Sequence, residues 1–316
     1  MFPGDACGGK AMNDLPLVTA VITTYNRPVA ILKRAIESVV NQTYSNIEIF
    51  IINDCPENLR LTEEIRAMLN EICTEKAITY IIQEKNAGAC HARNTALKNA
   101  KGEFFACLDD DDEWKAEKIE KQVCRALKDS NVSLVYCNSD IVNTVKNTTR
   151  IRFTEEQPEG DIYSLLIGDN IIGSCTFPLM RTDAVKKAGG FNEEFPALQD
   201  WDLYLRLLKN GKAGYVHESL AVYYFHEGER ISSHPERRVM AYEKLLGNIR
   251  QDLKNNKKSS SKFYFKGCYF YELNQQYGKA LNYYSKGIQS CPLDIKNNII
   301  ELSKFLYRLF IKPKVV

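Results

Sequence analysis

The sequence has no long apolar run and no large excess of either charge. None of its 316 residues lies in an apolar stretch near the roughly 18 residues that a membrane-spanning helix needs. Lys and Arg total 42 and Asp and Glu total 40, which gives a net charge of +2. A general nucleic-acid-binding protein carries a larger positive excess, so we expect no nucleic-acid partner.

The ten cysteines include no pair spaced C-x-x-C, and most lie in apolar or helical stretches. This pattern favours buried, reduced thiols in a cytoplasmic protein and leaves zinc binding and disulfides as alternatives. The first 16 residues contain no hydrophobic core of a secretory signal, so we interpret 1–16 as a flexible leader.

Apolar strands and amphipathic helices alternate over the first half of the chain. Strands are predicted at 17–26, 47–54, 78–83, 103–109 and 132–138, and helices at 30–42, 58–72, 88–100 and 116–129. This alternation predicts an α/β fold with a mostly parallel central sheet and helices on both faces. Ligands bind such sheets at the carboxyl ends of the strands.

The fourth strand, in "FFACLDDDDEW", ends in the four aspartates Asp109–Asp112. Like charges repel, and carboxylates beside an apolar layer lose solvation, so we expect basic side chains or a metal ion next to them. An acidic helix start is the alternative interpretation. An EF-hand calcium loop is excluded because Trp114 occupies the position of its central glycine.

A helical tail is predicted to follow the 17–235 domain and to span 236–316. Within it, 263–294 resembles one tetratricopeptide repeat; the matching residues are Tyr264, Gly267, Cys268, Tyr271, Ala280, Tyr284 and Pro292. A single repeat cannot bury its own face, so it should pack on the neighbouring helices, on the first domain or on another subunit. A plain helical hairpin without a partner role is the alternative.

Five stretches together resemble a family 2 glycosyltransferase of GT-A fold, over roughly residues 17–230. They are "VITTYNRP", "IINDCPEN", "NAGACHARNTAL", "FFACLDDDDEW" and "GGFNEEFPALQDWDLYLRL". The resemblance implies a GT-A fold with a C-terminal helical extension. It also implies transfer of a sugar, with inversion, from a nucleotide-diphosphate donor that is usually UDP-linked.

The resemblance also implies roles for the aspartate run. Asp109 and Asp111 match the two acids of the D-x-D element of the family. Asp111 is expected to bind Mn²⁺ or Mg²⁺, which would offset the charge of the diphosphate. Asp110 is expected to face the ribose or the sugar, and Asp112 is a supporting residue or simply part of an acidic helix start.

Four further residues match nucleotide-binding positions of the family. Asp54 corresponds to the acid that accepts the uracil N3–H, although Cys55-Pro56 departs from the usual turn and leaves base specificity open. Thr23 and Tyr25 match positions that hold the base, and Arg93 matches an arginine that contacts the nucleotide. The alternatives are ordinary turn chemistry for Asp54 and a surface arginine for Arg93.

The catalytic base implied by the resemblance is Asp200, at the start of a predicted helix. Gln199 replaces the acid that usually precedes it, which can alter acceptor binding. A helix N-cap is the other interpretation of Asp200. His226 matches a histidine that reaches the metal or the diphosphate, and a histidine without such a role is the alternative.

The sequence therefore predicts a metal-dependent enzyme that glycosylates a saccharide or lipid-linked acceptor in surface polysaccharide synthesis. The expected location is cytoplasmic, and the inner face of the cell membrane is left open because the last stretch mixes apolar and basic residues. An oligomer formed through the tail is also left open. The alternatives are a nucleotidyltransferase, disfavoured because no G-x-G or P-loop follows the first strand, and a nucleotide-sugar-binding scaffold acting through its tail.

Overall fold

The computed structural model describes residues 15–226 and 234–310. These residues form two compact units, which are described separately. The first unit takes residues 15–162, 172–193 and 206–226, and the second takes 163–171, 194–205 and 234–310.

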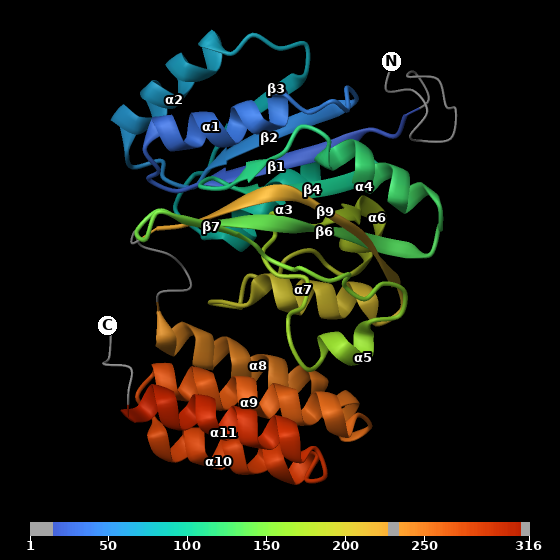
Figure 1. Ribbon diagram of the computed structural model, residues 1–316. Coiled ribbons are helices and arrows are strands. Elements are labelled where there is room, and N and C mark those ends of the chain that lie inside the picture. The colour runs from blue at the N-terminus through green and yellow to red at the C-terminus, as the bar shows by residue number, and fades with distance from the viewer. Residues whose placement is uncertain (1–14, 227–233, 311–316) are drawn as a thin grey trace. The chain divides into compact units, whose positions relative to one another are not determined.

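A nine-stranded sheet forms the centre of the first unit in the described part of the chain (Figure 1). Its strands are β1 (Val18–Thr24), β2 (Ile47–Asn53), β3 (Ala77–Ile82), β4 (Phe104–Asp109), β5 (Glu113–Trp114), β6 (Val132–Asn143), β7 (Thr148–Ile151), β8 (Leu179–Arg181) and β9 (Lys212–Phe225). The order is β3-β2-β1-β4-β8-β6-β9-β5, with β7 paired to β6. β1 to β4 are parallel to one another and β6 is parallel to β9, while β5, β7 and β8 pair antiparallel.

Helices cover both faces of the parallel strands, as the sequence predicted. They are α1 (Val29–Val40), α2 (Leu59–Glu71), α3 (Ala89–Asn99), α4 (Lys118–Leu127) and the short α6 (Thr182–Lys187). α1, α2 and α4 share one apolar cluster with alternate residues of β1, β2 and β4. α3 contacts β1 and β2 but adds no residue to that cluster, so it covers the opposite face. Strands buried on both sides explain why their sequences are continuously apolar.

The strand register brings the polar strand ends to one edge of the sheet. Thr23 lies opposite Asp109 across the β1–β4 ladder, and Thr24 lies opposite Asn53 across the β1–β2 ladder. Because these strands are parallel, the residues that follow each of them gather at the same edge. The aspartate run is therefore held next to the segments after β1 and β2.

The second unit is helical, and this confirms the predicted C-terminal extension. It contains α5 (Tyr163–Leu166), most of α7 (Gln199–Leu208), α8 (Pro235–Lys254), α9 (Lys257–Leu273), α10 (Tyr277–Ser290) and α11 (Ile295–Phe310). Tyr242 stacks on Phe263 with ring centres 4.5 Å apart, and Trp201 lies 5.7 Å from the same ring. Trp201 also donates its indole N–H to the Leu166 carbonyl at 2.8 Å. The start of α7 is thus packed into the helical tail.

The repeat-like stretch forms the helical hairpin α9–α10, which packs on α8 as expected of a unit that cannot bury its own face. Gly267 is required at this contact, because a Cβ there would lie 2.4 Å from the Tyr242 hydroxyl. The hairpin alone does not decide between a tetratricopeptide-type partner role and a plain structural one.

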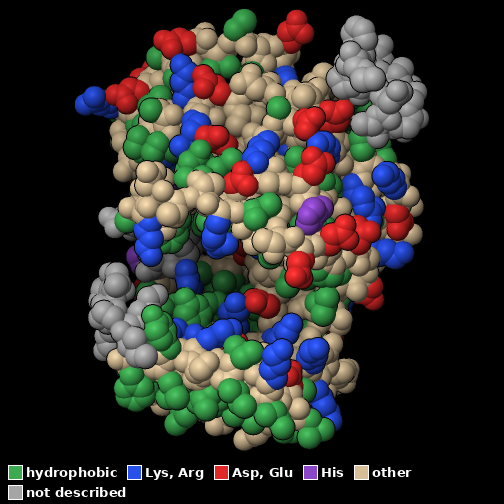
Figure 2. All heavy atoms as spheres, viewed as in Figure 1, with side chains coloured by type: hydrophobic (Ala, Val, Ile, Leu, Met, Phe, Trp, Pro, Cys, Tyr) green, Lys and Arg blue, Asp and Glu red, His purple; other side chains and the backbone are tan. Residues whose placement is uncertain are grey.

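α11 presents large apolar side chains to solvent, and Figure 2 shows hydrophobic side chains gathered over this part of the second unit. Its most exposed residues include Ile295, Ile299, Tyr307 and Phe310. Over the described residues, no helix combines the length and hydrophobicity needed to cross a membrane. Membrane contact and oligomer formation through the tail stay predictions.

A lysine lies fully buried under the sheet of the first unit. Lys118 has no exposed surface, donates to the Gln122 side-chain oxygen at 2.7 Å and sits 4.2 Å from the centre of the Trp114 ring. Burial lowers the pKa of this amine to about 8, because the charged form loses solvation, and the nearby thiols Cys137 and Cys107 oppose this shift. The folded state therefore loses the proton of this amine above about pH 8, well below the ordinary lysine pKa of 10.5.

This burial predicts a pH-dependent stability that a Lys118→Met variant should lack. Between about pH 8 and the ordinary lysine pKa of 10.5, the unfolded chain binds more protons than the folded chain. The free energy of unfolding of the wild type therefore rises with pH over this range, and this gain is lost again as the pH falls to about 8. The gain should reach about 3 kcal/mol. Urea unfolding of both proteins across this pH range measures the difference between their free energies of unfolding. The titration of the tyrosines affects both proteins and cancels in this difference. Exposed Lys98→Met is the control, and a pH-independent difference for Lys118→Met would contradict the prediction.

Candidate active site

The first aspartate of the run, at the end of β4, is held by two partners from distant parts of the chain. Asp109 accepts from the Arg93 guanidinium at 2.8 Å and from the Ser174 hydroxyl at 2.8 Å. Arg93 comes from α3, where it is buried with its Nε unpartnered among the described residues. Arg93 is therefore not the surface arginine of the alternative interpretation, because it faces the end of β4.

Arg27 and Arg34 supply positive charge to the next two aspartates. Arg27, in the loop between β1 and α1, contacts Asp110 at 2.9 Å through Nε and Asp111 at 3.2 Å through Nη2. Arg34, on α1, donates to the backbone carbonyl of Asp111 at 2.6 Å. The expectation of basic side chains beside the aspartate run is thus confirmed.

His226 directly follows β9 and lies at the same cluster. Its Nε2 is 2.8 Å from the Asp111 Oδ2 atom, the oxygen that also faces Arg27. The structure therefore brings the two predicted metal-binding residues into direct contact, although they are 115 residues apart in sequence.

Asp110 and Asp112 are the buried members of the run. Burial raises the pKa of Asp110 to about 6, against the lowering effect of the Arg27 charge. Burial also raises the pKa of Asp112 well above its ordinary value. Asp112 accepts from the Thr176 hydroxyl at 2.6 Å and from the Tyr224 backbone N–H at 3.1 Å. Asp112 thus ties the end of β4 to β9 and is unavailable to a ligand.

Asp54 lies at the end of β2, but its carboxylate is already engaged. Its two oxygens accept from the backbone N–H groups of Ala87 and Gly88 at 3.0 and 2.8 Å. The side chain is buried, so in this structure it fastens the loop between β3 and α3. Tyr25, in contrast, is 52% exposed just after β1, as a residue that stacks on a base requires. Thr23 is half-buried in β1 beside Asp109.

Asp200 belongs to the second unit, in the first turn of α7. One carboxylate oxygen accepts from the Trp201 backbone N–H at 2.8 Å, and the other accepts from the Asn170 amide at 3.3 Å. The predicted helix start is therefore observed, and Asp200 is half-buried there. Its catalytic role stays a prediction.

The cluster fits a divalent cation as a partial ligand set. Among the described residues, no group of three His, Cys, Asp or Glu side chains is arranged around one metal position. Asp111 and His226 converge, however, and Mg²⁺ commonly uses one or two carboxylates together with phosphate oxygens and water. A two-residue site completed by a diphosphate is compatible with this donor set.

Sequence reasoning missed four residues that build this site: Arg27, Arg34, Ser174 and Thr176. For Arg27 a signal was present, because it lies in the quoted stretch "VITTYNRP" at the end of a strand that meets the aspartate run. Ser174 and Thr176 lie in an irregular segment with no readable pattern, and only the fold brings them to β4.

Comparison with known proteins identifies relatives that match more than half of the chain. The family model described as Glycosyl transferase family 2 matches residues 19–189, more than half of the chain. WcaA of Escherichia coli strain K12, named as a glycosyl transferase of colanic acid biosynthesis, is 30% identical over 233 residues, covering 72% of this chain and 79% of WcaA. WfgD of E. coli, named UDP-Glc:alpha-D-GlcNAc-diphosphoundecaprenol beta-1,3-glucosyltransferase, is 34% identical over 194 residues, covering 61% of this chain and 70% of WfgD.

Solved structures support the fold. TarS of S. aureus aligns with a TM-score of 0.62 at 17% identity, covering 93% of this chain and 87% of the TarS fragment. The mannosyltransferase PcManGT from Pyrobaculum calidifontis, solved with GDP-Man and Mn²⁺, aligns with a TM-score of 0.57 at 17% identity, covering 94% of this chain and 86% of that one. At such identities the likeness concerns the fold, and the predicted GT-A class with a helical extension is confirmed.

The bond between Thr176 and Asp112 predicts a measurable loss of stability. Thr176→Val keeps the shape of the side chain but leaves the buried Asp112 carboxyl short of a donor and removes the weaker acceptor of the Asp109 backbone N–H. Together these losses should cost about 1–3 kcal/mol of unfolding free energy. Denaturant unfolding measures the effect. Thr182→Val is a matched control, because the buried Thr182 hydroxyl has no hydrogen-bond partner among the described residues. Equal losses in the two variants would show that the bond to Asp112 is unimportant.

Proposed function

The chain belongs to glycosyl transferase family 2, and on that premise we propose that it moves a sugar, with inversion, from a UDP-sugar to a hydroxyl of a saccharide or lipid-linked acceptor. The observation that carries the proposal is the charge cluster at the carboxyl edge of the sheet. There Arg27 contacts Asp110 at 2.9 Å and Asp111 at 3.2 Å. His226 lies 2.8 Å from Asp111, and Arg93 pairs with Asp109 at 2.8 Å.

The choice of UDP rests on the site and on relatives. Tyr25 offers an exposed ring beside β1, and Thr23, Asp54 and Arg93 border the same strand ends. TarS has been solved in complex with UDP-GlcNAc, and WfgD is named for UDP-Glc. PcManGT, solved with GDP-Man, has a related fold, so the base preference has to be measured.

Asp111 and His226 are the residues that would hold a divalent ion, Mn²⁺ or Mg²⁺. When bound, such an ion acts as a Lewis acid that offsets the negative charge of the diphosphate. Arg27 and Arg93 lie beside the same carboxylates and keep positive charge close to the position of the diphosphate. Asp110, buried against Arg27, would face the ribose or the sugar.

Asp200 is the proposed general base. As the acceptor oxygen attacks the anomeric carbon, a new C–O bond forms, and the bond between that carbon and the diphosphate oxygen breaks. The bonding electrons leave with the nucleoside diphosphate, and the acceptor proton moves to the Asp200 carboxylate. The hydrogen bonds from Trp201 and Asn170 hold this carboxylate in one orientation.

A role in surface polysaccharide synthesis is proposed from the relatives. WcaA is named for colanic acid biosynthesis, and WfgD for an acceptor carried on diphosphoundecaprenol. A lipid-linked acceptor would place the reaction at the inner face of a cell membrane.

Thermal-shift screening of nucleotide sugars with Mn²⁺ is the first test. We expect UDP-sugars to raise the melting temperature more than GDP- or TDP-sugars do. Donor hydrolysis is then measured with and without candidate acceptors. A protein that binds nucleotide sugars but never cleaves them would support the scaffold alternative and overturn the proposed activity.

Asp111→Ala should remove metal-dependent binding of UDP. The substitution deletes the carboxylate that contacts both Arg27 and His226, so one of the two proposed metal ligands is lost. Isothermal calorimetry with UDP, in the presence and absence of Mn²⁺, measures the loss. Asp183→Ala, which removes an exposed carboxylate of the same unit, is the control. Unchanged affinity in a folded Asp111→Ala protein would refute the metal assignment.

Asp200→Asn should separate binding from transfer. The amide keeps an oxygen that can accept from the Trp201 N–H but cannot take up the acceptor proton, so transfer should fall by about 10²- to 10⁴-fold. UDP affinity should stay near that of the wild type. Asp169→Asn, which weakens a half-exposed ion pair with Lys266 in the same unit, should keep full transfer. Near-normal transfer by Asp200→Asn would leave Asp200 with a structural role alone.

A further inference from the structure

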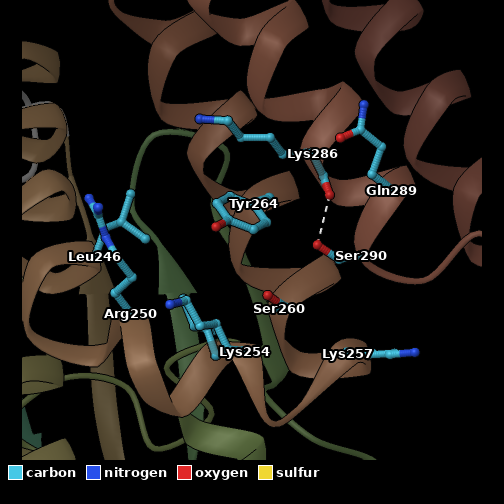
Figure 3. A pocket seen from close by; sticks show the side chains of 10 residues that line it. Leu246, Arg250, Lys254, Lys257, Ser260, Tyr264, Lys286, Gln289 and Ser290 are labelled. Carbon is cyan, nitrogen blue, oxygen red and sulfur yellow. Dashed lines mark hydrogen bonds between the residues drawn. The ribbon is translucent and has the colours of Figure 1, made fainter.

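The second unit contains a pocket of about 500 Å³ between α8, α9 and α10 (Figure 3). Each helix contributes residues spaced by four, which lie on one face of a helix. The pairs are Arg250 with Lys254 on α8, Ser260 with Tyr264 on α9, and Lys286 with Ser290 on α10. Buried Leu246 and Leu253 form an apolar floor.

The pocket is lined by four cations and by no acid. The cations are Arg250, Lys254, Lys257 and Lys286. α10 contains no acidic residue at all, and the acids of α8 and α9 have partners elsewhere. Glu243 accepts from the Tyr271 hydroxyl at 2.7 Å, Asp252 from the Tyr163 hydroxyl at 2.6 Å, and Glu272 pairs with Arg308. Glu236, in the first turn of α8, faces His234 at 3.5 Å.

The positive charge in the pocket is not neutralised by the described part of the chain. The exposed side chains of Arg250, Lys254 and Lys257 make no hydrogen bond or ion pair with any described residue, and Lys286 contacts the Tyr283 ring at 4.7 Å. Figure 3 shows Arg250 and Lys254 on one side of the pocket with Tyr264 facing them, Lys286 extending over Tyr264, and Lys257 pointing away. Like charges that line one pocket repel, and an anion bound there would relieve the repulsion.

We propose that this pocket binds a phosphate-bearing anion. Lysine and arginine side chains are the usual partners of phosphate oxygens, and the hydroxyls of Ser260 and Tyr264 add neutral donors. The volume exceeds that of a single inorganic ion and suits a diphosphate or the phosphate group of a larger molecule. The proposal rests on the second unit alone and does not depend on the proposed glycosyl transfer.

Two sources would supply this chemistry: a phosphate compound free in solution, or the phosphate headgroup of an anionic lipid. The first experiment titrates inorganic pyrophosphate into the full chain by calorimetry. Arg250→Gln/Lys254→Gln should weaken binding by at least about tenfold, because two charge-assisted contacts are lost. Pyrophosphate bound anywhere in the first unit would be unaffected by this double variant, so only the difference from the wild type is attributed to the pocket.

Lys258→Gln is the control. It removes one charge from an exposed position of α9 that lies outside the pocket lining. We expect it to bind pyrophosphate as the wild type does. The charge-keeping variant Arg250→Lys should retain most of the affinity. Circular dichroism and thermal unfolding check that each variant is folded.

The second experiment sediments the protein with vesicles of phosphatidylcholine, with or without phosphatidylglycerol. Loss of sedimentation with the anionic vesicles in the double variant identifies the lipid headgroup as the source. Binding of pyrophosphate without vesicle binding identifies a phosphate compound in solution. The proposal is overturned if the double variant binds both probes as the wild type does, if the wild type binds neither, or if Lys258→Gln weakens binding equally.

Discussion

Neutralisation of the four carboxylates at the end of β4 is the constraint around which the first unit is organised. Two unit charges about 4 Å apart interact by about 4 kcal/mol at the effective dielectric near a protein surface, so the run cannot be left unpaired. Its partners come from separate elements: Arg27 follows β1, Arg93 lies on α3, Thr176 precedes β8 and His226 follows β9. Bringing them together requires that the strands end at one edge.

The run is divided into carboxylates with different environments. Asp112 is buried and hydrogen-bonded to Thr176 and Tyr224, so it stabilises the fold. Asp110 is buried against Arg27 and has a raised pKa. Asp111 keeps an oxygen that faces both Arg27 and His226. Burial and hydrogen-bond partners thus give neighbouring aspartates different environments and different pKa values.

Much of the first unit could be predicted from the sequence, because apolar strands and 3.6-residue periodicity are local signals. The position of the aspartate run at the ligand-binding edge followed from strand order. The pairing of Arg27 with Asp110 spans 83 residues, and the bond from Thr176 to Asp112 spans 64, so neither has a local signature. The backbone contacts of Asp54 were also missed, because they depend on how the loop before α3 closes.

The anchoring of Trp201 bears on how chains of this kind can diversify. The residue beside the proposed base packs against Phe263, and its indole bonds to Leu166, so the helix start and the tail share one interior. A genetic exchange that joined the first 235 residues to an unrelated C-terminal segment would remove Phe263, on which Trp201 of α7 packs. We therefore expect a viable recombination breakpoint to fall upstream of residue 163 or past α9, the helix whose Phe263 contacts Trp201.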